Sequence, residues 1–279
     1  MEFAKTFAGI LRAMLYRLLK SRMTAAFLAV LTILIVYGIV GLKVIGADAA
    51  LSADASATSS DIALGLSVLA GGTGGVDFIH ACGMLFVRGS LISMVVAVFC
   101  GVFFASDLKS GAVKNVLQGR TGRFAYALAA GAITLAITVL AVLVGIVVSL
   151  AALMVSGFVV AAPDPAQFVC WFGEVWLSVA AYALLAVVVA LLSKSTALAA
   201  IAGFLLGGAA IENLLYSALG LITGHPSEVR AIFDGYLAVT VSQLGYGNVL
   251  TADALMPIFL TIIAAIIAGV LVLRRRSLA

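Results

Sequence analysis

Six long apolar segments, separated by polar ones, restrict the fold of this chain more than any other feature. About 20 residues of α-helix cross the roughly 30 Å hydrocarbon core of a bilayer. The segments are continuously apolar, whereas barrel strands alternate in polarity over about ten residues. The sequence therefore predicts an all-α integral membrane protein with six transmembrane helices: Ala25–Leu42, Met84–Ser106, Tyr126–Ser149 with an apolar continuation to Val160, Val175–Leu192, Thr196–Leu219 and Ala254–Leu273.

The composition excludes an ordinary soluble domain. Hydrophobic residues make up 64% of the 279 residues and charged residues only 10%, whereas soluble domains are about half apolar and about a quarter charged. The net charge of +4 comes from residues that flank the apolar segments. We therefore expect contact with anionic lipid and not with nucleic acid.

The basic residues predict the orientation of the chain in the membrane. Thirteen of the 16 lie on one side of the predicted spans, and only Lys43, Arg88 and Arg230 lie on the other. The positive-inside rule then places both termini in the cytoplasm of a cell whose plasma membrane holds this multi-pass protein. The thirteen are Lys5, Arg12, Arg17, Lys20, Arg22, Lys109, Lys114, Arg120, Arg123, Lys194, Arg274, Arg275 and Arg276.

Residues 1–24 have the pattern of an amphipathic helix that lies on the cytoplasmic membrane surface. They contain basic residues throughout and no uninterrupted apolar stretch, which argues against a cleavable signal. At about 100° per residue one face is apolar. Such a helix either only fixes the topology or also contacts a cytoplasmic partner. The apolar face comprises Phe3, Phe7, Ile10, Leu11, Met14 and Leu18.

The remaining residues, 25–279, form one predicted permease domain with two long extracellular loops. The first loop, 47–82, is rich in Ala, Ser and Gly, and its Gly71–Gly75 run lacks the Lys-Ser/Thr of a phosphate-binding loop. The second, 222–248, is semi-apolar, and we expect a pair of short re-entrant or interfacial helices there, before the last span. The chain shows no nucleotide-binding motif of its own.

Catalytic and metal sites have little support in the sequence. Asp77, His80 and Cys82 stand close together, but no second cluster completes a metal site of three or four ligands. No Ser or Cys pairs with a His and a carboxylate, so we expect neither a catalytic residue nor a bound metal. Cys82 and Cys170 could form a disulfide near the outer ends of two spans.

Three ionisable residues lie within or beside predicted spans: Arg88, Glu174 and Glu212. Charges inside a membrane often mark a substrate pathway or an ion pair, and a purely structural pairing is the alternative. Gly203 and Gly207 have the spacing of closely packed membrane helices. That spacing fits packing within one chain or contact between two copies.

The cytoplasmic connection between the second and third spans, Ala105–Arg123, is longer than a turn requires. It is polar, and glycines interrupt it at three positions. We interpret it as a surface that a partner contacts. The alternative is a loop whose charges only fix the topology.

This connection carries a resemblance to a known family. The segment FASDLKSGAVKNVLQGRTGRFAYALA resembles the exit of the second span in type-2 ABC exporter permeases, most closely those that confer immunity to lantibiotics and other antibiotics. The basic N-terminal helix ending in LLKSRMT is similar to the connecting helix of that family, and the insert before the last span resembles its re-entrant helices. The long Gly/Ser-rich first outer loop departs from the pattern.

The resemblance implies a permease subunit without ATPase activity. It would pair with a second permease, identical or homologous, and bind two cytoplasmic ABC ATPase subunits that hold ATP and magnesium. Replacing Asp107 and Arg123 is then expected to uncouple hydrolysis from export. The residues expected to couple the permease to the ATPase are Asp107, Lys109, Gly111, Lys114, Gly119, Arg120 and Arg123.

The resemblance also suggests an amphipathic substrate, with a peptide antibiotic favoured. Two other functions stay open at this point. An ATP-independent carrier or channel would need a polar path at mid-membrane, where no acidic or basic residue is securely placed. A structural or sensing subunit would move no substrate at all.

Overall fold

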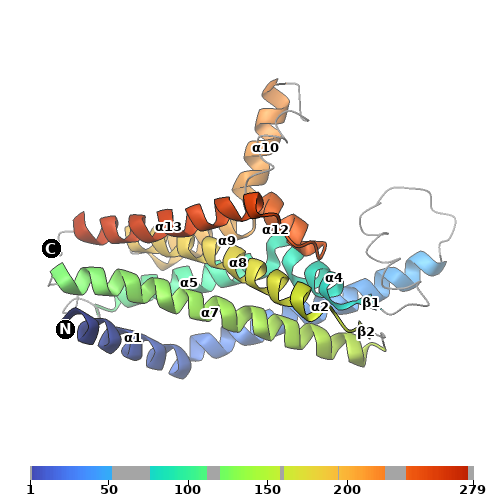
Figure 1. Cartoon of the computed structure of the whole chain (residues 1–279), viewed down its shortest axis with the longest axis horizontal. Helices are drawn as coiled ribbons and strands as arrows, with labels where there is room; N and C mark the ends of the chain where they lie inside the picture. The colour runs from blue at the N-terminus through green and yellow to red at the C-terminus, as the bar shows by residue number, and fades with distance from the viewer. Residues whose placement is uncertain are drawn as a thin grey trace.

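The computed structural model describes residues 2–51, 76–111, 120–157, 160–193, 195–223 and 237–275. Almost all of this part of the chain is helical (Figure 1). Both termini lie at one end of an elongated helix bundle, here called the terminal end, and the opposite end is called the far end (Figure 1). Five described helices are long and apolar enough to cross a membrane, which supports the predicted multi-pass helical membrane protein.

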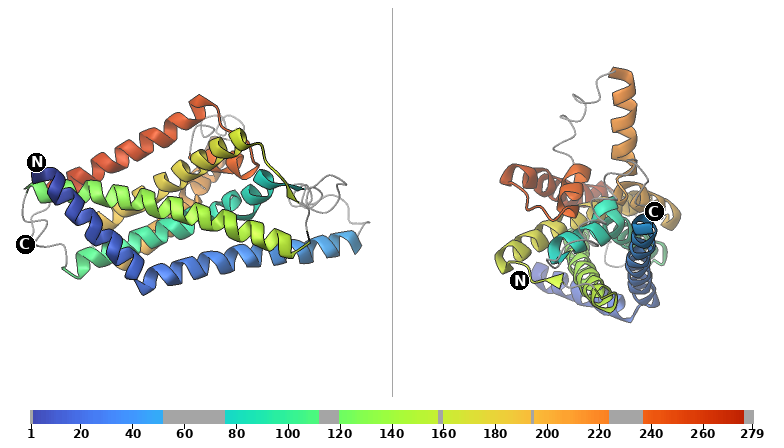
Figure 2. Two further views of the ribbon diagram at one scale, coloured as in Figure 1. Left: turned by 60° about the horizontal axis from the view of Figure 1, so that its bottom comes forward. Right: turned by 90° about the vertical axis from the view of Figure 1, so that its right-hand side faces the viewer.

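The long helices run between the two ends of the bundle (Figure 2). Each is made almost entirely of apolar residues. As a helix, each also pairs its own backbone hydrogen-bonding groups, as the lipid interior requires. Four of the predicted spans lie within these helices, and the second begins before its helix does. The five long helices are α2 (Arg22–Leu51), α5 (Leu91–Lys109), α7 (Arg120–Val155), α8 (Pro165–Ser193) and α13 (Ala252–Arg275).

The shorter elements lie at the two ends or link the spans. A two-residue parallel pairing joins β1 to β2, with Val76 opposite Val160. The N-terminal helix packs mainly along α7. These elements are α1 (Glu2–Lys20), β1 (Val76–Asp77), α4 (Phe78–Cys82), η1 (Gly83–Val87), η2 (Arg88–Ser90), β2 (Val160–Ala161), α9 (Thr196–Gly207), α10 (Ala210–Thr223) and α12 (Leu237–Gly245).

Local sequence signals explain where several helices begin and end. Asp164 precedes Pro165, the first residue of α8, and its Oδ1 accepts a hydrogen bond from the Ala166 amide at 3.4 Å, as an N-cap does. Ser195 caps α9 through the Leu198 amide. Between α1 and α2, the Thr24 hydroxyl donates to the Leu18 carbonyl at 2.6 Å.

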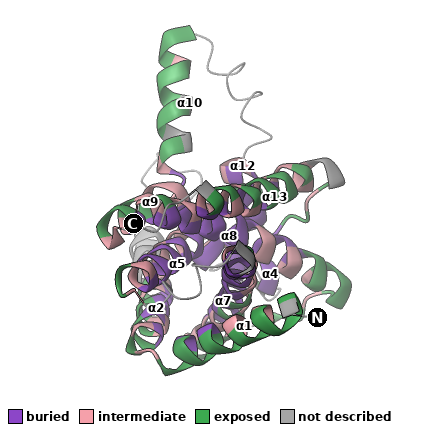
Figure 3. Ribbon diagram, turned by 90° about the vertical axis from the view of Figure 1, so that its left-hand side faces the viewer, coloured by how far each residue is buried: buried purple, intermediate pink, exposed green. Residues whose placement is uncertain are grey.

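Helix α8 forms the centre of the bundle and is buried along most of its length (Figure 3). It contacts α5, α7, α9 and α13. Helices α5 and α9 pack closest, since a Cβ atom on Gly203 would lie 2.6 Å from the Val98 amide nitrogen and one on Gly207 would lie 2.7 Å from the Met94 Cα. The glycine pair found in the sequence therefore serves contact within one chain.

Two predicted spans differ from the helices observed. The second begins at Leu91 and not Met84, because the chain turns at Ser90, which has a left-handed φ of 57°. The fifth, Thr196–Leu219, is two helices, α9 and α10, separated by Gly208 and Ala209. Ala209 also has a positive φ, of 54°. The residues around Ala209 are apolar or glycine, so the apolar pattern does not reveal that turn, whereas Arg88 and Gly89 interrupt the apolar pattern just before Ser90.

The two predicted outer loops lie only partly in the described part of the chain. Residues 52–75 and 224–236 fall outside it. Of the short helices expected in 222–248, the structure describes α12, which packs against η1, η2 and α8. In α1, the predicted apolar face packs against the bundle: Met14 and Leu18 are buried, and Phe7, Ile10 and Leu11 pack against the core.

Candidate functional site

The polar connection between α5 and α7 begins at the terminal end of the bundle. Helix α5 ends there because Gly111 adopts a φ of +72°, which suits glycine at a helix C-terminus. The Ser110 amide donates to the Ser106 carbonyl at 2.9 Å, and its hydroxyl donates to the Asp107 carbonyl at 3.0 Å. Lys109 is exposed at this end. The start of the connection therefore has a fixed backbone and an accessible basic side chain.

Asp107, the first predicted coupling residue, faces the protein interior. Its side chain is 1% exposed and forms an ion pair with Arg17 of α1. Apart from Arg17, no described residue donates a hydrogen bond to its carboxylate. A buried carboxylate needs such a partner because desolvation of an unpaired charge is costly. Asp107 thus joins α1 to α5 and does not present its charge to a cytoplasmic partner.

The start of α7 adds two residues to this end of the bundle. Tyr126 is buried, and its hydroxyl has no hydrogen-bond partner among the described residues. Arg123 donates from Nη1 to the Arg274 carbonyl at 3.4 Å, near the end of α13. Phe3 of α1 contacts Phe124 of α7, with ring centroids 5.6 Å apart. Helices α1, α5, α7 and α13 are therefore connected at the terminal end.

The remaining predicted coupling residues are only partly placed. Lys114 and Gly119 lie outside the described residues, and Arg120 is the first residue of α7. The structure brings Asp107, Lys109 and Gly111 together at the end of α5 and places Arg123 at the start of α7.

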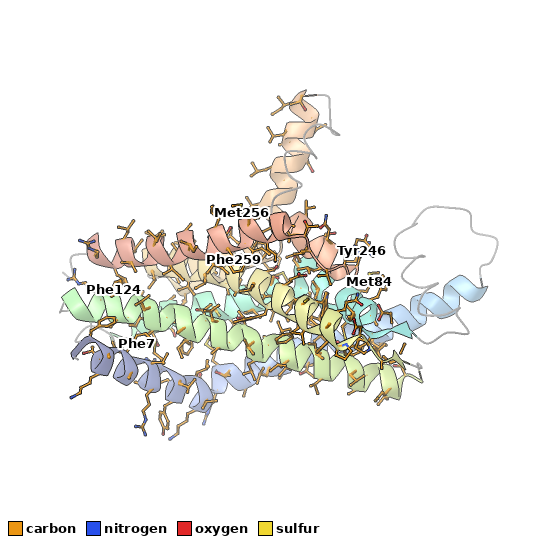
Figure 4. All side chains as sticks on the ribbon, viewed as in Figure 1. Phe7, Met84, Phe124, Tyr246, Met256 and Phe259 are labelled. Carbon is orange, nitrogen blue, oxygen red and sulfur yellow. The ribbon has the colours of Figure 1, made fainter. Side chains whose placement is uncertain are left out.

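Glu174 and Arg88, two of the predicted intramembrane residues, lie at the far end of the bundle. Glu174 is 7% exposed, and its Oε2 accepts a hydrogen bond from the Leu250 amide at 3.0 Å. The Arg88 guanidinium lies over the Tyr246 ring, 4.6 Å from its centroid, and its Nη1 contacts Met84 Sδ at 3.3 Å. Both side chains thus contact residues in or near the segment that connects α12 to α13. Figure 4 labels Tyr246 and Met84 at this end of the bundle.

Other contacts hold the same segment. Trp171, which is fully buried, donates from Nε1 to the Leu244 carbonyl at 2.9 Å. His80 Nδ1 lies 2.9 Å from the Tyr246 carbonyl oxygen. A Cβ atom on Gly83 would lie only 2.6 Å from the Gly245 carbonyl oxygen. This arrangement favours a packing role over a substrate pathway for Arg88 and Glu174.

Glu212 lies on a different helix from Arg88 and Glu174. It belongs to α10, which projects from the bundle (Figure 1). The structure therefore places Arg88 and Glu174 in the far-end packing and Glu212 on a different element.

The cysteines and the Asp77–His80–Cys82 cluster show no metal-site geometry. All three cysteines are free thiols, so Cys82 and Cys170 are not bridged. Burial raises the pKa of the Cys82 thiol to about 12, with a smaller contribution from Asp77. Within the described ranges, no group of three or more His, Cys, Asp or Glu side chains could hold a metal ion.

Sequence reasoning missed the partner of Asp107 and the hydrogen bond of Trp171. The sequence analysis identifies Arg17 only as one of the basic residues that precede the first span. A sequence signal for the pair exists only in part: an acid at the end of an apolar helix and a base in an amphipathic one. Their 90-residue separation hides the contact.

No protein-family model matches the chain, and no curated protein is significantly similar to it.

Proposed function

We propose that this chain is the permease subunit of an ATP-driven exporter of the plasma membrane. Both termini and the 110–119 connection face the cytoplasm, and the chain itself hydrolyses no ATP. Cytoplasmic ABC ATPase subunits, carrying ATP and magnesium, dock against that connection. A second permease, identical or homologous, completes the transporter. The six membrane crossings consist of the five long helices and the passage through α9.

One observation supports this proposal most strongly: the connection is anchored at both sides to helices of the terminal end. Arg17 pairs with Asp107 before it, and Arg123 donates to Arg274 after it. A displacement of the connection would therefore act on four helices at once, as a rigid-body transmission of an ATPase movement requires. A loop that only fixed the topology would need no such anchoring.

The anchoring divides the predicted coupling residues into two roles. Lys109 is exposed and basic, which suits contact with an acidic groove on an ATPase. Asp107 is a positioning residue, because its charge is engaged with Arg17 inside the protein. Helix α1 then works as a connecting helix that couples the ATPase movement to the bundle.

The proposed substrate is an amphipathic molecule, with a peptide antibiotic of the lantibiotic type as the leading candidate. The apolar composition of the spans agrees with such a substrate. The choice of a peptide depends on the family resemblance alone.

The test measures ATP hydrolysis and export by the chain together with the ABC ATPase that copurifies with it. Lys109→Ala should weaken the association and reduce ATP-driven export several-fold. Lys5→Ala removes the same charge from an exposed position at the same end of the molecule and serves as the matched control. Export that is equal in both variants, or the absence of any copurifying ATPase, would overturn the proposal.

A further inference from the structure

Helix α10 leaves the bundle at a turn that the backbone specifies. Helix α9 ends at Gly207, and Ala209 then adopts a left-handed φ of 54°. This conformation costs a residue with a Cβ atom on the order of 1 kcal/mol or more, so it persists only where the surrounding structure favours it. In two views α10 runs across the long axis of the bundle and projects from it (Figures 1 and 2).

The contacts of α9 place this turn beside the first residues of α5. A Cβ atom on Gly207 would lie 2.7 Å from the Met94 Cα, three residues after α5 begins at Leu91. The 19 residues of α5 extend about 28 Å, close to the roughly 30 Å thickness of the hydrocarbon core. With α5 taken to span that core, a helix that starts beside Met94 and runs across the bundle axis would lie near the membrane surface.

The sequence of α10 separates polar from apolar positions completely. At 100° per residue, all polar residues and the one glycine fall within an arc of about 140°. All aliphatic residues fall in the remaining arc. The first group is Glu212, Asn213, Tyr216, Ser217, Gly220 and Thr223, and the second is Ala210, Ile211, Leu214, Leu215, Ala218, Leu219, Leu221 and Ile222.

Apolar side chains are exposed on both α9 and α10. On α9, Leu198, Ile201 and Phe204 are each more than half exposed, which indicates a lipid-facing surface in a membrane protein. On α10, Leu221 and Ile222 are 85% and 80% exposed. Helix α10 contacts chiefly α9 (Figure 3), so the described chain leaves these two side chains uncovered.

We propose that α10 is a monotopic helix that binds the lipid interface at the level of the first residues of α5. Its aliphatic face enters the acyl-chain boundary and its polar stripe faces the headgroups and water. Glu212 is the only residue of α10 whose side chain is ordinarily charged at neutral pH. The helix is therefore held by apolar burial and needs no anionic lipid. The proposal requires only an integral membrane protein, so it is independent of the transport function.

Spin labels on the two faces of α10 test this placement. The full chain, with Cys82, Cys100 and Cys170 replaced, is reconstituted in phosphatidylcholine bilayers with a single nitroxide. Labels at Leu214 and Ile222 probe the aliphatic face, and labels at Ser217 and Thr223 probe the polar stripe. Leu143 on α7 and Lys5 on α1 provide the membrane-interior and water references.

The expected result is a several-fold higher ratio of oxygen to nickel-complex accessibility on the aliphatic face than on the polar stripe. The ratio should not change when anionic lipid is added. Ratios equal to that of Leu143 on both faces would make α10 transmembrane, and ratios equal to that of Lys5 on both would place it in water. Low accessibility to both reagents at Leu214, with spin–spin coupling between molecules, would indicate a second copy. Any of these three results overturns the proposal.

Discussion

The two ends of the helix bundle are held together by different kinds of contact. At the terminal end, the Arg17–Asp107 ion pair joins α1 to α5, and Arg17 is 44% exposed to solvent. At the far end, Trp171 and Glu174 hydrogen-bond the backbone at Leu244 and Leu250, and Gly83 packs against the backbone of Gly245. The buried or partly buried contacts to backbone at the far end fix positions closely, whereas the half-exposed ion pair and the exposed hydrogen bond from Arg123 to the Arg274 carbonyl can separate and re-form.

This difference fits the proposed division of labour. In the proposed transporter the terminal end would receive the movement of an ATPase, so an interaction that water can partly replace would suit it. The far end would keep its shape while the helices move. Variants at each end should therefore differ in how stability and coupling are affected.

The largest effect is expected at the ion pair. Arg17→Met leaves the Asp107 carboxylate buried without its partner. Loss of one partner of a fully buried pair costs about 3–5 kcal/mol; because Arg17 is partly exposed, we expect about 2–3 kcal/mol. Denaturant titration in bicelles measures the change. The double variant Arg17→Met/Asp107→Asn should recover most of the loss, and no recovery would mean that Asp107 is not a buried charge.

The next largest effect is expected from Gly83→Ala at the far end. The added Cβ atom would lie 2.6 Å from the Gly245 carbonyl oxygen, so α12 must shift, and such overpacking costs about 2 kcal/mol. Gly173→Ala is the matched control, because nothing lies within 4 Å of its Cβ position. Equal stability of the two variants, measured by thermal denaturation in detergent, would contradict the close packing.

Trp171→Phe tests the hydrogen bond to the backbone with little change in shape. The Leu244 carbonyl loses its 2.9 Å donor in a buried position, which costs about 1–2 kcal/mol. Faster amide hydrogen exchange should follow in α12 and not in α1. Unchanged exchange in α12 would show that this contact does not hold the segment.

The smallest effect is expected at the turn before α10. Ala209→Gly removes left-handed strain of about 1–2 kcal/mol and adds an entropy cost of about 0.5–1 kcal/mol. The variant should therefore be more stable by about 0.5 kcal/mol, whereas Ala209→Val should be less stable than the parent chain. The same denaturation assay compares the two. Lower stability of the glycine variant would contradict a left-handed Ala209.

The sequence predicts the long apolar helices because lipid imposes continuous hydrophobicity, but it predicts six spans where five described helices are long and apolar enough to cross a membrane. The turn at Ala209 is not predicted because the residues around it are apolar or glycine, and the turn at Ser90 is missed although the polar Arg88 and Gly89 precede it. The terminal end was found from its charges, but the inward direction of Asp107 depends on Arg17, 90 residues earlier. The packing of the far end depends on hydrogen bonds to backbone groups such as the Leu244 carbonyl. Residue types do not reveal such bonds.

Reconstitution tests the central claim, that an external ATPase drives this chain, most directly. Vesicles contain the purified chain alone or together with its copurifying ABC ATPase, and accumulation of a lantibiotic-type peptide is measured with and without ATP and magnesium. The account predicts accumulation only when chain, ATPase and ATP are all present, and its loss in the Lys109→Ala variant but not in Lys5→Ala. Accumulation by the chain alone, without ATP, would contradict it.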